Sequence, residues 1–232
     1  MKKSFITSLI ALTVSPSLLA ASYTVEIQNL TQGTYYAPLL VSAHPSGVKL
    51  FSAGMAASAN LQAMAEGGDI SGLEIDMMNA GAEYIANPAA GLLAPGMKTT
   101  AELGDPGATN TQLSIVAMLS PTNDGFVALN NLTLPTAPGT YTYMLNGYDA
   151  GTEANTEIRG GGAPGVAGMP VPPPLEALVG TGGTGVAATV EGFVHIHRGV
   201  LGDHMMSSGM SDINASSQRW LNPVARVTLT VE

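Results

Sequence analysis

Apolar and polar residues alternate along several short segments of the chain, which is the pattern of strands with one buried face. In the segment Ser22–Thr31, Tyr23, Val25 and Ile27 all fall on one side. The run Tyr35–His44 predicts a second strand, in which Pro38 favours an edge or a bulge. We expect further strands in the runs Thr111–Ser120, Asn130–Leu134, Gly139–Gly151, Ala188–Gly199 and Pro223–Glu232.

Helical periodicity is confined to one part of the sequence. Residues 55–68 are rich in Ala, place Leu61, Met64 and Ala65 on one face and end in two glycines, so they predict a helix. Residues 71–81 favour a second, short helix. Residues 80–106 are expected to be irregular, and the Gly- and Pro-rich residues 160–185 are expected to form a long loop.

These elements predict an all-β fold. Helices separate the strands too rarely for a parallel sheet, so an antiparallel β-sandwich with one or two short helices and long loops is favoured. The two strands after the long loop cannot form a stable domain alone and must pair with earlier ones. We therefore expect residues 22–232 to form one domain.

The first residues have the form of a secretory signal peptide. Lys2 and Lys3 precede an apolar run that is too short to span a bilayer, and small residues around Ala21 fit a cleavage site. We expect residues 1–21 to be removed on export, which places the protein in the periplasm or outside the cell. No later segment is apolar enough to predict a membrane span.

Charge and composition narrow the classes of partner. Without Lys2 and Lys3, six basic residues face seventeen acidic ones, so the chain is expected to repel nucleic acid and to attract divalent cations. The chain has no Cys, so disulfide bonds cannot stabilise it in an oxidising compartment. Core burial and a bound ion are the remaining sources of stability.

Three carboxylates follow a predicted strand in the stretch "NGYDAGTEANTE", residues 146–157. Asp149, Glu153 and Glu157 recur every four residues, but Gly147 and Gly151 disfavour a helix there. A turn rich in Asp, Asn, Thr and Gly supplies the oxygen ligands that calcium prefers. A second acidic turn, "PTNDGF", carries Asp124. These patterns leave a calcium site and a solvated acidic turn both open.

The sequence also resembles a known family. The runs "LSPTNDGFVALNNLTL" and "TYTYMLNGYDAGTEANTEI" are similar to the spondin N-terminal domain of the F-spondin and mindin type. The segments "SAHPSGVKLFSAGMAASANLQAMAEGGD", "GFVHIHRGVLGD" and "WLNPVARVTLTVE" extend the resemblance over nearly all of residues 23–232, with most likeness to bacterial exported members.

The resemblance implies an eight-stranded antiparallel sandwich with a Ca²⁺ site at one end. It implies Asp124, Asp149 and Glu153 as ligands, together with backbone carbonyls. This chain has Glu at position 153, where animal members usually have Asp. Glu157 is then expected to be solvated. The implied function is non-catalytic adhesion or extracellular recognition, and the extracellular partner, a protein or a glycan, is unknown.

Two other functions stay open at this point. His195 and His197 are two residues apart on a predicted strand, so both side chains project from one face. His204 follows, near three Met residues. Imidazole and thioether groups are typical ligands of a periplasmic copper or zinc protein. A hydrolase is the second alternative, although Gly-x-Ser-x-Gly, His-Glu-x-x-His and phosphate-loop motifs are missing. The single Trp, Trp220, is expected to serve the core.

Overall fold

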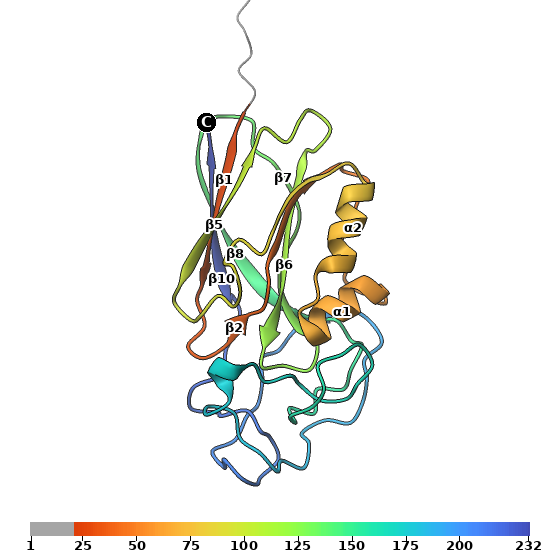
Figure 1. The fold of residues 1–232 in the computed structure, drawn as a ribbon, viewed down its shortest axis with the longest axis vertical. Coiled ribbons are helices and arrows are strands. Elements are labelled where there is room, and N and C mark those ends of the chain that lie inside the picture. The colour runs from red at the N-terminus through yellow and green to blue at the C-terminus, as the bar shows by residue number, and fades with distance from the viewer. Residues whose placement is uncertain (1–20) are drawn as a thin grey trace, which may run out of the picture.

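The computed structural model describes residues 21–232, so the predicted signal peptide lies outside the described residues except for Ala21. The chain folds mainly into antiparallel β-structure with two short helices (Figure 1), which confirms the predicted fold class. The strands are β1 (Tyr23–Asn29), β2 (Tyr35–Tyr36), β3 (Leu40–His44), β4 (Glu83–Ala86), β5 (Lys98–Gly104), β6 (Gln112–Ser120), β7 (Gly125–Thr133), β8 (Gly139–Asp149), β9 (His195–Ile196) and β10 (Ala225–Val231).

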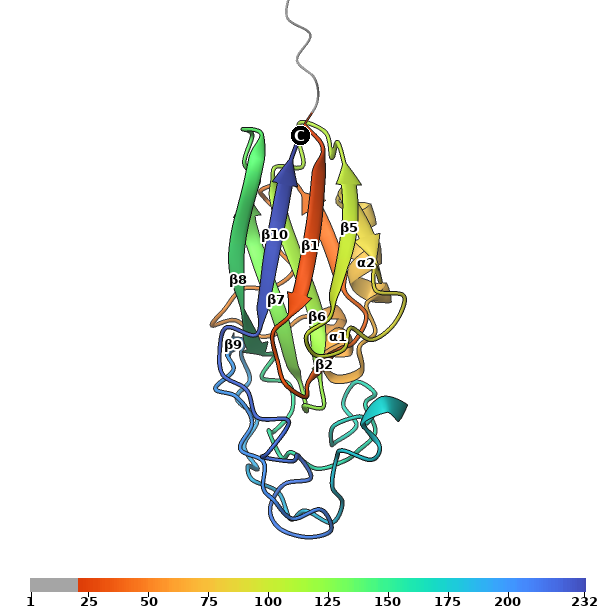
Figure 2. The same cartoon turned by 90° about the vertical axis from the view of Figure 1, so that its left-hand side faces the viewer.

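One long strand joins the two layers of the fold. The main strand order is β4-β3-β6-β7-β8-β10-β1-β5, with β2 paired to β6 and β9 paired to β8. The first half of β8 pairs with β10, from Gly139 to Leu145, and its second half pairs with β7, from Asn146 to Asp149. The sheet therefore curls into a nearly barrel-shaped body (Figure 2).

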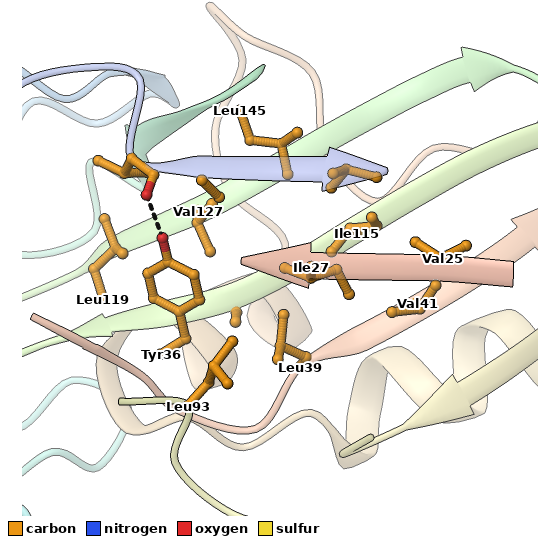
Figure 3. Packing of buried hydrophobic residues seen from close by; sticks show 14 of the residues in the cluster. Val25, Ile27, Tyr36, Leu39, Val41, Leu93, Ile115, Leu119, Val127 and Leu145 are labelled. Carbon is orange, nitrogen blue, oxygen red and sulfur yellow. Dashed lines mark hydrogen bonds between the residues drawn. The ribbon is translucent and has the colours of Figure 1, made fainter. Parts of the chain in front are cut away.

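The core lies between the two layers. The inward residues of β1, Val25 and Ile27, are fully buried against residues of β6 and β7, as the alternating pattern of this segment predicts. Tyr36 reaches across the core and donates a hydrogen bond of 2.6 Å from its hydroxyl to the carbonyl oxygen of Val224 (Figure 3). This bond satisfies the one polar atom of a ring that is otherwise buried among apolar side chains.

Two helices cover the outer face of the β3–β6–β7 layer. They are α1 (Ala59–Gly67) and α2 (Ser71–Asn79), as predicted for residues 55–68 and 71–81. The side chain of Ser58 accepts a hydrogen bond from the backbone of Leu61 and caps the start of α1, while Gly68 ends it in a left-handed conformation, with φ of 73°. Buried side chains of both helices form a second apolar cluster with Phe126.

Two sequence predictions were wrong. Residues 80–106 are not irregular throughout, because β4 and β5 form there and pair with β3 and β1. The predicted strand over residues 188–199 is reduced to β9, His195–Ile196, which pairs with the end of β8. In both cases the available sheet edge decides the outcome, and the local pattern does not.

The long connections gather at one end of the body. Both described termini lie at the opposite end, while most of the chain from 150 to 222 forms loops beyond the ends of β6 and β8 (Figure 1). A three-residue helix, η1 (Pro173–Leu175), is the one helical turn in this segment. We call residues 150–222 the loop end. Asp124 and Asp149 both lie where the sheet meets it.

Candidate metal centre

Asp124 lies in the turn between β6 and β7 and is fully buried. Its Oδ2 accepts hydrogen bonds from the backbone nitrogens of Thr152, at 2.7 Å, and Glu153, at 3.1 Å. Its Oδ1 is also buried and has no hydrogen-bond partner within residues 21–232. A buried carboxylate oxygen without a partner is costly, because the protein replaces none of the water it has lost.

A second buried carboxylate lies beside it. Asp149 is the last residue of β8, where it is paired with Gly125, and the Ala150 nitrogen donates to the Asp124 carbonyl at 3.1 Å. Burial, and then the negative charge of Asp149, raise the pKa of Asp124 to about 7. The structure thus brings together two of the three predicted ligands. A bound cation would reduce the electrostatic repulsion between their carboxylates.

Asp149 also faces two imidazole rings. Its Oδ1 accepts from the Gly151 nitrogen at 2.8 Å, and its Oδ2 accepts from Asn155 Nδ2 at 2.6 Å. His195 Nε2 lies 3.6 Å from Oδ1, and His197 Nε2 lies 3.8 Å from Oδ2. Both distances are too long for hydrogen bonds. The two rings do project toward one point, as their spacing in the sequence predicts.

The third predicted ligand has other partners. The Oε1 atom of Glu153 accepts hydrogen bonds from Asn123 Nδ2, at 2.9 Å, and from the Gly168 nitrogen. Its backbone nitrogen, and not its carboxylate, contacts Asp124. Glu153 therefore ties the turn before β7 to the loop around Gly168, and its role as a metal ligand stays a prediction.

Glu157 is not solvated, which corrects the expectation from its sequence. It is buried, with a positive φ of 57°, and its carboxylate accepts from the nitrogens of Leu201 and Gly202 and from the Ser211 hydroxyl. These partners come from a distant segment of the loop end. Glu157 thus holds residues 201–211 to the segment that follows β8, and the local turn pattern gave no sign of these partners.

The tautomers of the two rings follow from their other contacts. The Nδ1 atom of His195 lies 3.0 Å from the carbonyl oxygen of Ile196, which can only accept, so Nδ1 carries the proton and Nε2 has a free lone pair. The Nδ1 atom of His197 accepts from the Gly199 nitrogen at 3.0 Å, so in the neutral ring Nε2 carries the proton. Burial lowers the pKa of His197 and keeps that ring neutral.

His204 and the nearby methionines do not join this group. His204 is exposed and its Nδ1 lies 3.0 Å from the Ser216 hydroxyl. Met205, Met206 and Met210 are also exposed. Trp220 is buried as expected and packs on the His197 ring, with 4.9 Å between the ring centroids.

Two polar residues near Asp149 were missed by sequence reasoning. Glu191 offers a carboxylate oxygen that lies, together with donor atoms of Asp149 and His195, in a group whose members are all within 4.8 Å of one another. Asn155 connects two of these residues, because its Nδ2 lies 2.6 Å from Asp149 Oδ2 and 3.4 Å from Glu191 Oε1. The spacing of an acid four residues before His195 was the one available signal.

A pocket of about 570 Å³ opens beside these residues. Its polar part is formed by the carboxylates and imidazoles, with Arg198 among the lining residues, and its apolar part includes Phe193, Ile196 and Leu201. None of its described lining residues is Ser, Thr or Cys. The pocket therefore offers metal-ligating groups but no hydroxyl or thiol nucleophile.

The spondin N-terminal sequence model (Spondin_N) matches residues 24–160, more than half of the 232 residues. The match contains Asp124, Asp149 and Glu153 but ends before Glu191 and His195. No curated protein sequence matches the chain significantly. Within residues 21–232, no helix is both long and apolar enough to cross a membrane. The chain belongs to the spondin N-terminal domain family, a type of extracellular recognition module.

Proposed function

We propose that the protein is an exported, non-catalytic recognition module whose loop end is ordered by a calcium ion bound at Asp124 and Asp149. One observation carries this proposal: two buried carboxylates lie beside each other, and an oxygen of Asp124 has no hydrogen-bond partner within the described part of the chain. A divalent cation would coordinate the unpartnered oxygen of Asp124. It would also remove the repulsion between the two carboxylates.

The donor chemistry favours calcium for this role. Calcium takes six to eight oxygen ligands from carboxylates, backbone carbonyls and water. The ligand set implied by the family resemblance consists only of oxygen donors. Glu153 completes that set if its carboxylate leaves Asn123 and Gly168; otherwise it stabilises the turn from outside the ion.

An ion at this position would act on the recognition surface through the turn that follows β8. The backbone of Thr152 and Glu153 is bonded to Asp124, and Glu157 further along binds residues 201 and 202. Fixing Asp124 and Asp149 therefore fixes the start of the loop end, where an extracellular protein or glycan would bind. Loops held by a rigid scaffold are the usual sites of recognition.

A thermal melt tests the calcium part of the proposal. With calcium at about 100 times its dissociation constant, binding to the folded state stabilises it by about 2.7 kcal/mol. For a chain of this size that raises Tm by about 5–11 °C. Asp124→Asn should abolish the rise, while Asp105→Asn, which changes an acid at the opposite end of the body, should keep it. An unchanged wild-type Tm at millimolar calcium contradicts the proposal.

The recognition part needs a separate readout. Arrays of glycans and extracellular proteins should be probed with the chain from residue 22 onward, in calcium and in EGTA. Binding in calcium that is lost in EGTA, and weakened in Asp124→Asn, is the expected result. Binding of the same strength in EGTA would show that the ion does not order the recognition surface.

A further inference from the structure

The pocket beside Asp149 has donor chemistry different from that of the calcium site. One atom each from Asp149, Glu191 and His195 lie within 4.8 Å of one another, and His195 Nε2 lies 3.6 Å from Asp149 Oδ1. None of these three donor residues is Asp124 or Glu153. The group mixes one nitrogen with two carboxylates, whereas calcium prefers oxygen alone.

The Nε2 atom of His195 has the protonation state that a metal ligand requires. His195 donates its Nδ1 proton to a backbone carbonyl, so the lone pair of Nε2 is directed toward a carboxylate oxygen and has no hydrogen-bond partner within residues 21–232. A lone pair facing a carboxylate is repulsive unless a cation lies between them. Metal-bound histidines characteristically donate their other ring proton to a carbonyl or carboxylate, as His195 does.

The carboxylates are held in place by neighbouring polar groups. Asn155 connects Asp149 to Glu191, and the second oxygen of Glu191, Oε2, is buried without a partner in the described chain. His197 is more than nine-tenths buried, and its Nε2 also lacks a partner there and lies 3.8 Å from Asp149. The proton of the neutral His197 ring is on Nε2, so this nitrogen offers no lone pair and His197 is not counted as a ligand.

We propose that Asp149, Glu191 and His195 form a binding site for a borderline divalent ion of the zinc class. Two ligands each about 2.0–2.1 Å from a tetrahedral zinc ion are about 3.4 Å apart. The 3.6 Å between His195 Nε2 and Asp149 Oδ1 is within a few tenths of an ångström of that separation. Three protein ligands leave a fourth position, which faces the pocket of about 570 Å³.

The absence of sulfur from this group argues against a copper(I) site. Thioether and thiolate ligands select Cu(I), while imidazole suits zinc. No Met is among the described lining residues of the pocket, and Met205, Met206 and Met210 are exposed elsewhere on the loop end. The three methionines near His204 therefore supply no ligand here.

The zinc site and the calcium site share Asp149 but can be separated by experiment. Asp124 belongs to the calcium proposal alone, and Glu191 and His195 belong to the zinc proposal alone. Asp124→Asn therefore tests the first and His195→Gln tests the second. Zinc binding that persists in Asp124→Asn would support this inference even if calcium binding fails.

The test uses the chain from residue 22 onward after removal of metals by a chelator. Zn²⁺ affinity is measured by titration calorimetry, and Co²⁺ is used as a spectroscopic probe of coordination by nitrogen and oxygen. The matched control for His195→Gln is His204→Gln, which removes an exposed imidazole outside the pocket. Glu191→Gln is the second variant, in case His195→Gln fails to fold.

We expect micromolar or tighter Zn²⁺ binding by the wild type and by His204→Gln. Changes to groups that only surround a metal cost about 10–100-fold in affinity, so loss of a direct ligand in His195→Gln or Glu191→Gln should cost roughly tenfold or more. Zn²⁺ affinity that is unchanged in both variants overturns the assignment. So does a wild type that binds Ca²⁺ but not Zn²⁺.

Discussion

Replacing Asp124 by Asn should stabilise the protein when calcium is removed at alkaline pH. The carboxylate is buried beside Asp149, and its pKa is raised from 3.8 to about 7. At about 1.36 kcal/mol for each pKa unit, that difference corresponds to about 4 kcal/mol of lost stability when Asp124 is ionised. Asn carries no charge and its amide can donate to Asp149, so the variant avoids this cost.

The pH dependence has a definite sign. The pKa of Asp124 is higher in the folded state than in the unfolded state, so the folded protein binds more protons between about pH 4 and pH 7. Its stability therefore falls as the pH rises through that window. From the same pKa values, roughly 2–3 kcal/mol of the wild-type stability should be lost between pH 5 and pH 8 through this residue alone.

Urea denaturation in EGTA at pH 5 and pH 8 measures the effect. Other titrating groups are common to wild type and Asp124→Asn, so their difference isolates position 124. The variant should exceed the wild type by about 4 kcal/mol at pH 8 and by about 2 kcal/mol at pH 5. Calcium at about 100 times its dissociation constant should narrow this difference at pH 8 by about 2.7 kcal/mol, because it stabilises only the wild type. An equal dependence on pH in both proteins would refute the reasoning about this carboxylate.

Three further changes test the packing around the site. Glu157→Gln should lower the free energy of unfolding by about 1–3 kcal/mol in urea, because an amide group would face the backbone donors of residues 201 and 202; an unchanged midpoint would contradict its role in holding residues 201–211. Phe126→Ala should lower the free energy of unfolding by about 3–5 kcal/mol in the same assay, since this fully buried ring stacks on Tyr148. A loss below 1 kcal/mol would show that neighbouring side chains of the cluster under the helices fill the cavity. Ser58→Ala should cost about 1 kcal/mol through loss of the α1 cap, and Ser58→Gly only a few tenths; equal costs would argue against capping.

Local pattern predicted the elements whose environment is set by one buried face. The alternation of Tyr23, Val25 and Ile27 predicted β1, and the spacing of Leu61, Met64 and Ala65 predicted α1. Local pattern failed where a strand forms only by pairing with a segment that is distant in the sequence. The strand β5 forms from a segment with little apolar content because β1 offers it an edge, and most of the predicted strand over residues 188–199 finds no such partner.

The same limit applies to the site. Family resemblance indicated Asp124 and Asp149, and the neighbouring ends of β7 and β8 bring them together. Glu191 was missed because its carboxylate meets Asp149 only after β9 pairs with β8, a contact across about forty residues of sequence. Glu157 was misjudged for a similar reason, since its partners come from residues 201–211, which no spacing within the turn could show.

The central claim is that a cation binds the two aspartates and orders the loop end, and calcium titration calorimetry on chelator-treated protein measures it most directly. The account predicts one calcium ion bound per wild-type chain and no measurable binding by Asp124→Asn. Binding of equal strength and stoichiometry in Asp124→Asn, or no binding by the wild type at millimolar calcium, would contradict it.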